Sequence, residues 1–347
     1  MKNNISNIVI FRLSSIGDII LTSALVRCLR NTYPNAKIDF IVKRQFKHIP
    51  ELMPEINTIH VFDSDGGFKE LRRLRKVIAA EKYDVLLDIH KNWRSTFIRN
   101  TVGAKQVYTF KKHIVKRFFM IRFKIDAYHI VRPVYLRFVD AAYKLGVRYD
   151  SKKTELRIPS ETQKKVDNFL EDHSIKPHKT TIVLCPGASF INKEWPQENF
   201  LELARLIIHE LKHQVVLLGG SKEQEVCEHI ANSVEGKIIS VAGKFNLKES
   251  AALLNRAQAT VANDTGMLHM SEALKVPVVG IYGPTVRQFG YFPILEKSTV
   301  AEVELACRPC TKMGMHTCPE NTFACTKNIT VSQVYTLLNS IIKTIDS

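Results

Sequence analysis

The first candidate for chemistry is a short segment of small and charged residues, Arg12–Asp18, that follows an apolar run. Ser14, Ser15 and Gly17 leave backbone N–H groups accessible near the start of an expected helix, which favours an anionic or hydroxylated ligand. Asp18 lies in the first turn of that helix. A purely structural interpretation is also open, in which Ser15 caps the helix and Asp18 complements its dipole.

A second candidate is the loop Pro186–Pro196, which contains a turn of small residues followed by Lys193. Such a turn favours phosphate oxygens, with the lysine acting as a point charge. The loop is not a Walker A motif, because the Gly-Lys-Ser/Thr ending is absent. The alternative is an ordinary solvated loop that carries a surface lysine.

The third candidate lies where an apolar run ends in Asn-Asp-Thr-Gly and a helix is expected to begin. The backbone N–H groups of Thr265 and Gly266 would point at a diphosphate at the helix N-terminus, and Gly266 permits close approach. Asp264 would repel phosphate, so it is expected to cap the turn or accept hydrogen bonds. His269 follows one turn later on the same side. Its alternative is a buried, hydrogen-bonded histidine.

The three segments lie at expected strand-to-helix junctions, because the apolar pattern predicts strands in alternation with helices, which favours parallel sheets. Ligands bind at the carboxyl ends of the strands in an open parallel sheet. The expected strands are Ile8–Leu13, Lys37–Val42, Thr58–Phe62, Asp84–Asp88, Thr181–Cys185, Gln214–Leu218, Ile238–Val241, Thr260–Asn263 and Val276–Tyr282. The expected helices include Asp18–Arg30, Phe68–Glu81, Gln197–Leu211, a helix that ends near Val234, Leu247–Arg256 and Val331–Ile345.

Length and composition indicate two globular domains. The chain has 347 residues, 45% of them hydrophobic, which suits two cores of middling size. The polar stretch Ile158–Lys179 is expected to connect the domains. No signal peptide and no apolar run of membrane-spanning length is visible, so we expect a cytoplasmic protein. The formal net charge of +16 favours polyanionic partners, although it also serves solubility.

The stretch Ile89–Ile125 concentrates this charge, because it contains ten Lys or Arg residues and no Asp or Glu. Phenylalanines are interleaved with the cations. This mixture suits docking to an anionic membrane face or to a phosphorylated lipid acceptor. It also suits single-stranded nucleic acid, or a solvated basic face with a few aromatic rings turned inward.

Four cysteines lie close together near the C-terminus, at Cys307, Cys310, Cys318 and Cys325. Four thiols within nineteen positions are compatible with a structural zinc site, although the spacings are not those of a standard zinc ribbon. The alternative is free thiols in a packed loop, because a cytosolic environment disfavours disulfides.

Taken together, the motifs resemble one family. Arg12–Thr22 is similar to the N-terminal signature of the heptosyltransferases, glycosyltransferase family 9. Asn263–His269, continued by Ala273–Thr285, resembles the C-terminal signature. The Lys-x-Trp-Pro of the loop Gly187–Pro196 stands where that family has a phosphate-binding lysine, and Cys307–Cys310 is also similar to many members.

The resemblance implies an α/β protein of the GT-B fold, with two Rossmann-like domains whose parallel sheets face a cleft. Residues 1–160 would form the acceptor-binding domain and residues 161–325 the nucleotide-sugar-binding domain. Residues 326–347 would form a C-terminal helix that returns to the N-terminal domain.

The resemblance also implies roles. Asp18 would be the general base of an inverting, metal-independent transfer of heptose from ADP-heptose to the inner core of lipopolysaccharide, and Lys193 would help to stabilise the leaving diphosphate. An acidic residue would bind the ribose, either Glu223 or Glu225. The implied substrate-binding residues are Ser14, Ser15, Gly17, Ser189, Glu223, Asp264, Thr265, Gly266 and His269.

The implied partners are a nucleotide-sugar donor, a lipid-linked saccharide acceptor and the anionic inner face of the inner membrane, with no nucleic acid and no cofactor required for catalysis. Three alternatives remain. The donor could be a different nucleotide sugar on the same scaffold. The chain could be a basic, Rossmann-like nucleic-acid-binding protein, for which Asp18 would be dispensable. It could also be a sugar-nucleotide epimerase, which would act on the donor alone.

Overall fold

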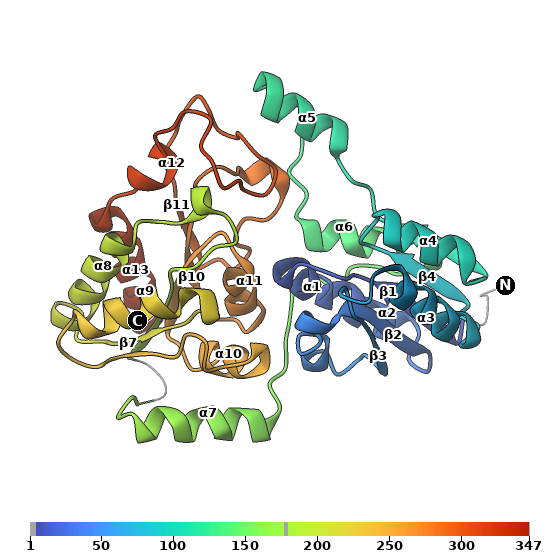
Figure 1. Cartoon of the computed structure of the whole chain (residues 1–347), viewed down its shortest axis with the longest axis horizontal. Helices are drawn as coiled ribbons and strands as arrows, with labels where there is room; N and C mark the ends of the chain where they lie inside the picture. Colours follow the sequence, from blue (N-terminus) through green and yellow to red (C-terminus); the bar gives the residue numbers. More distant parts are fainter. Residues whose placement is uncertain (1–4, 177–179, 347) are drawn as a thin grey trace. The chain divides into compact units, whose positions relative to one another are not determined.

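The computed structural model describes residues 5–176 and 180–346. Contacts divide the chain into two compact units, drawn in Figure 1. The first unit runs to Lys112 and resumes at Arg132–Arg157, and the second contains His113–Val131 and the chain from Ile158 onward. The predicted domain border at residue 160 stays a prediction, and His113–Val131 groups with the second unit.

The first unit is built on a parallel sheet of five strands in the order β3-β2-β1-β4-β5. Residues Ile8 to Phe11 of β1 are fully buried, as expected for a central strand covered on both faces. The strand order reverses direction between β1 and β4, so the loops that follow these two strands flank the position where open sheets bind ligands. The strands are β1 (Asn7–Phe11), β2 (Lys37–Lys43), β3 (Thr58–Phe62), β4 (Val85–Asp88) and β5 (Gln106–Thr109).

One predicted helix of this unit is divided in the structure, and two helices, α4 and α6, were not predicted. The predicted helix Asp18–Arg30 begins earlier and is divided at Thr22, whose Oγ1 donates to the carbonyl oxygen of Ile19 at 2.6 Å. The hydroxyl therefore competes with the regular backbone pattern. The α-helices are α1 (Ile16–Leu21), α2 (Ser23–Thr32), α3 (Gly67–Ala80), α4 (Trp93–Thr101) and α6 (Val134–Asp140). Short 3₁₀ helices cover Arg44–Phe46, Pro50–Leu52 and Tyr143–Leu145.

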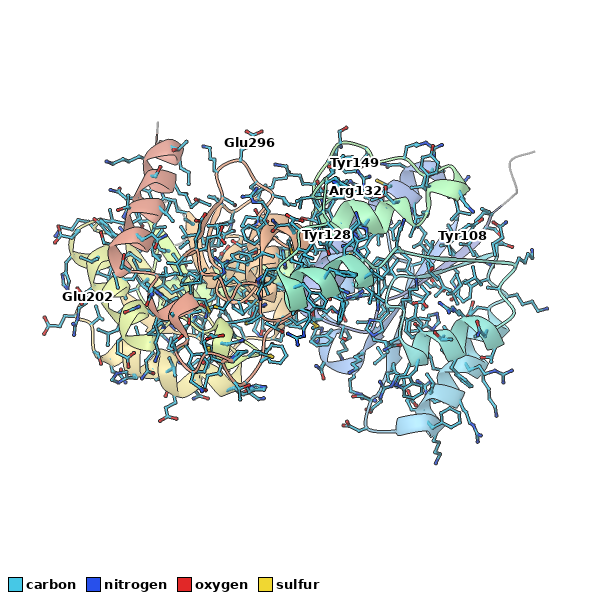
Figure 2. The ribbon with its side chains drawn as sticks, turned by 90° about the horizontal axis from the view of Figure 1, so that it is seen from above. Tyr108, Tyr128, Arg132, Tyr149, Glu202 and Glu296 are labelled. Carbon is cyan, nitrogen blue, oxygen red and sulfur yellow. The ribbon has the colours of Figure 1, made fainter. Side chains whose placement is uncertain are left out.

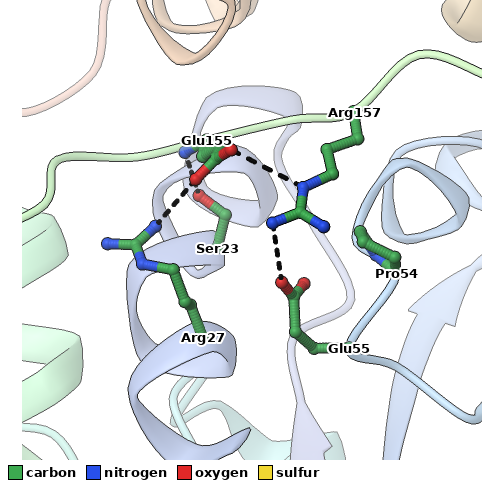
Figure 3. Close-up of a pocket in the computed structure, with 6 residues that line it drawn as sticks. All are labelled: Ser23, Arg27, Pro54, Glu55, Glu155 and Arg157. Atoms are coloured by element: carbon green, nitrogen blue, oxygen red, sulfur yellow. Dashed lines mark hydrogen bonds and ion pairs between the residues drawn. The ribbon is translucent and has the colours of Figure 1, made fainter. Parts of the chain in front are cut away.

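The last residues of the first unit are attached to α2 by partly buried polar contacts, some of which are drawn in Figure 3. Arg27 forms an ion pair with Asp150 at 2.7 Å and donates to the carbonyl oxygen of Lys153 at 2.9 Å. Ser23 accepts from the backbone N–H of Glu155 at 3.0 Å. Nearby, the hydroxyls of Tyr135 and Tyr149 lie 3.4 Å apart, and Tyr149 is labelled in Figure 2. These contacts fix the chain where it leaves this unit.

The second unit contains a parallel sheet of six strands in the order β11-β10-β9-β6-β7-β8. Here the order reverses between β6 and β9, and the loops that follow these strands flank the corresponding binding position. The strands are β6 (Thr181–Cys185), β7 (Gln214–Leu217), β8 (Ile238–Ser240), β9 (Ala259–Asn263), β10 (Val278–Ile281) and β11 (Thr299–Ala301). Both units are thus Rossmann-like.

Amphipathic helices cover this sheet. In α8, Phe200, Leu203, Ala204 and Ile207 recur at helical spacing and are fully buried. The α-helices are α5 (Ile114–Phe123), α7 (Ser160–Asp172), α8 (Gln197–His209), α9 (Gln224–Asn232), α10 (Leu247–Leu254), α11 (Gly266–Ala273), α12 (Ala324–Lys327) and α13 (Val331–Asp346). Short 3₁₀ helices cover Ile191–Lys193, Ser221–Glu223 and Arg287–Phe289.

The polar stretch expected to be a connection is largely helical. Helix α7 buries Val166 and Leu170, and the Asp167 carboxylate pairs with Arg256 at 2.6 Å. Its charged residues occupy the exposed side of an amphipathic helix, which the composition alone did not reveal. The end of the predicted connection, residues 177–179, lies outside the described residues.

The C-terminal helix requires a correction. In α13, Val334, Leu338, Ile341 and Ile342 are buried in the same hydrophobic cluster as the apolar face of α8. The expected return of residues 326–347 to the N-terminal domain is therefore wrong for this buried face, which completes the core of the second unit. Across the described ranges, none of the helices has both the length and the apolar character needed to cross a membrane.

Candidate functional site

The loop that follows β1 holds a buried ion pair between Arg12 and Asp18. The Arg12 guanidinium contacts the Asp18 carboxylate and also donates to the carbonyl oxygens of Ser14, at 2.8 Å, and Ile89, at 2.6 Å. Arg12 and Asp18 are only 7% and 8% exposed. Because Ile89 directly follows β4, this single side chain links the two loops at the reversal point of the first sheet.

Ser15 contributes to the same cluster. It is the N-cap residue of α1, and its backbone N–H and hydroxyl donate to Oδ2 of Asp18 at 3.5 and 3.2 Å. The Asp18 carboxylate is therefore oriented by contacts from two directions. Ser15 is exposed, Ser14 is half-buried and Gly17 is buried. Ser15 occupies the N-cap position of α1, and the roles predicted for Ser14, Ser15, Gly17 and Asp18 stay predictions.

The pattern of the sequence did not single out His90, which lies beside this ion pair. Burial, followed by the positive charge of Arg12, lowers the pKa of His90 to about 3, so its imidazole is neutral at physiological pH. Its Nδ1 is buried and lacks a hydrogen-bond partner within the described part of the chain. The adjacent Asp88 is fully buried and accepts from the backbone N–H groups of His90 and Lys91 at 3.1 and 2.7 Å.

In the second unit, Lys193 and Asp264 meet at the carboxyl end of β9. The Lys193 ammonium lies 2.6 Å from Oδ2 of Asp264 and donates to the backbone carbonyl oxygen of the same residue at 2.8 Å. Thr285, from the loop that follows β10, also donates to Oδ2 of Asp264, at 2.8 Å. Three strand-end loops thus converge on one carboxylate, and Asp264 accepts hydrogen bonds as the sequence suggested.

Asn263 explains why the lysine loop reaches this position. Its amide is fully buried, accepts from the backbone N–H of Trp195 at 3.1 Å and donates to the carbonyl oxygen of Pro186 at 2.7 Å. Both ends of the loop are therefore attached to the last residue of β9. Trp195 is itself buried, and its indole N–H donates to the carbonyl oxygen of Ile329 at 2.8 Å. Sequence reasoning placed Asn263 in the motif without seeing this role.

The start of α11 presents polar groups at the same end of the sheet. Thr265 is the N-cap residue, and its hydroxyl is buried without a hydrogen-bond partner among the described residues. Helix α11 begins at Gly266. The first N–H groups of any α-helix have no hydrogen-bond partner within the helix. The arrangement can therefore donate several hydrogen bonds to an anion. His269 is buried one turn later, and its ring centroid lies 6.2 Å from that of Tyr291.

The two acidic candidates for ribose binding occupy different environments. Glu223 is half-buried, accepts from the backbone N–H of Gly220 at 2.8 Å and packs so closely on Gly187 that a Cβ there would lie 2.4 Å from its Cγ. Glu225 is exposed on α9. Only Glu223 therefore lies against the lysine loop. Ser189, in the same loop, is exposed.

Comparison with known proteins identifies the family of this chain. The family model of glycosyltransferase family 9 (heptosyltransferase) matches residues 71–320, which is more than half of the chain. The chain belongs to glycosyltransferase family 9. Lipooligosaccharide heptosyltransferase 2 of Haemophilus influenzae is 27% identical over 306 residues, 85% of this chain and 88% of the relative. Lipopolysaccharide heptosyltransferase 3 of Escherichia coli is 28% identical over 286 residues, 79% of this chain and 81% of the relative.

Solved structures agree on the fold. A family 9 glycosyltransferase from Veillonella parvula superposes with a TM-score of 0.80 at 23% identity, covering 99% of this chain and 98% of its own. The ADP-heptose lipopolysaccharide heptosyltransferase II of E. coli gives a TM-score of 0.77 at 22% identity, covering 98% of this chain and all of its own. The family 9 assignment and the GT-B fold are thus confirmed, and the protein is a glycosyltransferase.

The cysteines of this family 9 enzyme are free thiols. Burial, followed by the neighbouring thiols, raises the pKa of Cys325 to about 11 and that of Cys310 above its ordinary value. At Cys318, burial acts in the same direction, but backbone N–H groups hold its pKa below the ordinary value. Among the residues described, no group of three or more His, Cys, Asp or Glu side chains is arranged to hold a metal ion. The zinc prediction at Cys307, Cys310, Cys318 and Cys325 thus gains no support and stays a prediction.

Proposed function

We propose that this glycosyltransferase transfers a heptose from ADP-heptose to a sugar of the inner core of lipopolysaccharide, with inversion and without a catalytic metal. The named relatives support the class of reaction, because they are heptosyltransferases of lipopolysaccharide or lipooligosaccharide. The E. coli enzyme of the same fold is named an ADP-heptose lipopolysaccharide heptosyltransferase. The acceptor is accordingly a lipid-linked saccharide.

The buried Arg12–Asp18 ion pair is the observation that carries the mechanism. Direct displacement at the sugar needs a general base, such as a carboxylate, that accepts the proton of the attacking hydroxyl. Asp18 is such a carboxylate, held at the end of β1 by Arg12 and Ser15, so that little reorganisation is needed during the reaction. Ser14 and Gly17 shape the acceptor side of this loop.

Stabilisation of the leaving diphosphate is proposed for the second unit. Lys193 supplies a positive charge, and the N-terminus of α11, with Thr265 and Gly266, supplies hydrogen-bond donors. These groups offer the positive electrostatic environment that the growing charge of the leaving group requires. Glu223 binds the ribose hydroxyls, whereas Ser189, Asp264 and His269 line the donor site. The donor thus binds the second unit and the acceptor the first.

We place the reaction in the cytoplasm, at the inner face of the inner membrane, where a lipid-linked acceptor is accessible. The test compares binding of ADP-heptose with that of UDP- and GDP-sugars by calorimetry, on the wild type and on Thr265→Tyr. Selective binding of ADP-heptose that the substitution abolishes supports the donor and its site. Selective binding of another nucleotide sugar would retain the reaction class and refute the heptose donor, and binding of DNA or RNA alone would refute both.

A further inference from the structure

Helix α5 exposes an unusual amount of apolar surface. Of its ten residues only Met120 is buried, although the helix is rich in phenylalanine and β-branched residues. The large exposed apolar side chains of this helix and of the segment after it are Ile114 (60%), Val115 (67%), Phe118 (56%), Phe119 (40%), Phe123 (54%), Ile125 (54%), Ile130 (82%) and Val131 (36%). Contiguous exposed apolar surface of this kind marks an interaction site.

The three phenylalanines form one cluster. The ring centroids of Phe118, Phe119 and Phe123 lie 5.7 to 6.0 Å from one another. The guanidinium of Arg122 lies 5.9 Å from the Phe123 ring. Lys116 is half-buried 5.7 Å from the ring of Tyr128, which is labelled beside the helix in Figure 2. Aromatic and cationic groups are thus interleaved on one short element.

The base of the helix is fixed to the second unit. Lys124 ends α5 in a left-handed conformation, and its ammonium donates to the backbone carbonyl oxygens of Cys307 and Pro309 at 2.8 and 2.7 Å. Gln288 donates to Asp126 at 3.0 Å. Asp126 is the one acidic residue of the segment His113–Val131. The exposed apolar face therefore belongs to a segment that is attached to the second unit. Apart from Asp126, the charged residues of this segment are cationic.

We propose that His113–Val131 is a membrane-docking element that places the Phe118–Phe119–Phe123 cluster in the headgroup region of an anionic phospholipid bilayer. Phenylalanine rings interleaved with Lys and Arg match the two requirements of such a surface, apolar burial and attraction to anionic lipid. This inference deepens the proposed function by naming the surface that brings the enzyme to a lipid-linked acceptor. It does not depend on which nucleotide sugar is the donor.

Vesicle co-sedimentation of the full-length protein tests the element. Phosphatidylcholine vesicles are compared with vesicles that also contain phosphatidylglycerol, and the wild type is expected to bind only the latter. The triple variant Phe118→Ser/Phe119→Ser/Phe123→Ser is expected to bind these vesicles at least about tenfold more weakly. The control Phe68→Ser/Tyr143→Ser, which removes two aromatic side chains exposed by 47% and 59% on the first unit, should bind as the wild type does.

The electrostatic part has its own variant, Lys116→Gln/Arg117→Gln/Arg122→Gln. It should weaken binding to anionic vesicles by about tenfold or more at low salt, and high salt should remove most of the difference. The matched control replaces three exposed basic residues of α3 by glutamine: Lys69, Arg72 and Lys76.

Activity separates this proposal from the proposed function. With a delipidated, soluble acceptor, the phenylalanine variant should retain wild-type turnover and ADP binding, which also shows that it is folded. Equal vesicle binding by wild type and triple variant would overturn the docking element even if transfer is intact. The proposal would also be overturned if the wild type did not bind vesicles and formed a dimer that the triple variant did not form. Binding of an oligonucleotide instead of anionic vesicles would overturn it as well.

Discussion

The ammonium group of Lys193 lies 2.6 Å from the carboxylate of Asp264, and both side chains are largely buried. The lysine proposed to stabilise the leaving diphosphate thus has a counter-charge at the end of β9. A diphosphate bound at the N-terminus of α11 would share this lysine with Asp264. Asp264 therefore positions the cation, and the hydrogen bond from Thr285 fixes the carboxylate in turn.

Removal of the positive charge of Lys193 should lower mainly the turnover number, kcat. Lys193→Met removes the charge and keeps most of the apolar stem, and we expect kcat to fall by about 10² to 10³, the range found when one stabilising donor is removed from an active site. Steady-state kinetics with a soluble acceptor measures the effect. The exposed Lys222 provides a matched control, and Lys222→Met should have wild-type kinetics. An unchanged kcat in Lys193→Met would contradict the role given to this residue.

The Asn263 amide is expected to contribute both to the stability of the protein and to its binding of ADP. Asn263→Ala leaves the backbone N–H of Trp195 and the carbonyl oxygen of Pro186 without their partner, in a buried position. We expect the free energy of unfolding to fall by about 2 to 4 kcal/mol and the affinity for ADP to fall with it. Urea unfolding and calorimetry measure these effects. Gln197→Ala, at an exposed position, is the control, and equal stability of both variants would refute the loop attachment.

His90 should make the protein sensitive to acid. Its pKa is about 3 when folded, below the ordinary value of 6.5, so the unfolded chain binds the proton more readily between these values. The free energy of unfolding therefore falls as the pH falls through this window, by up to about 1.4 kcal/mol per pH unit. The stability of His90→Gln should depend less on pH between 7 and 5. Urea unfolding at both values tests this, and the exposed His229→Gln should keep the wild-type slope.

Local pattern predicted the central strands well, because buried strands such as β1, β4, β6 and β9 are continuous apolar runs bounded by polar residues. It did not reveal β5, which is only partly buried, or the three-residue edge strand β11. It also placed the interdomain connection over α7, whose two buried residues are too few to stand out among its charges. These elements depend on tertiary packing more than on periodicity.

The features of the candidate site also fall into those that the sequence predicted and those that it did not. Ser14–Asp18 and Asp264–Gly266 could be found because small residues, a strand end and a helix start are all local signals. The bond from Arg12 to Ile89, the neutral His90 and the attachment of the lysine loop by Asn263 arise from contacts between segments distant in sequence. A single sequence holds no local signal for such contacts.

The rate of sugar transfer by the variant Asp18→Asn tests most directly the central claim that Asp18 is the general base. The variant keeps the size of the side chain and removes its ability to take a proton. We predict that it binds ADP-heptose as the wild type does but transfers heptose to the acceptor at least about 10²-fold more slowly in a single turnover. Ser15→Ala, which removes one hydrogen bond to the same carboxylate, should be affected much less. Transfer by Asp18→Asn at the wild-type rate, with the donor bound, would contradict the assignment of Asp18 as the base.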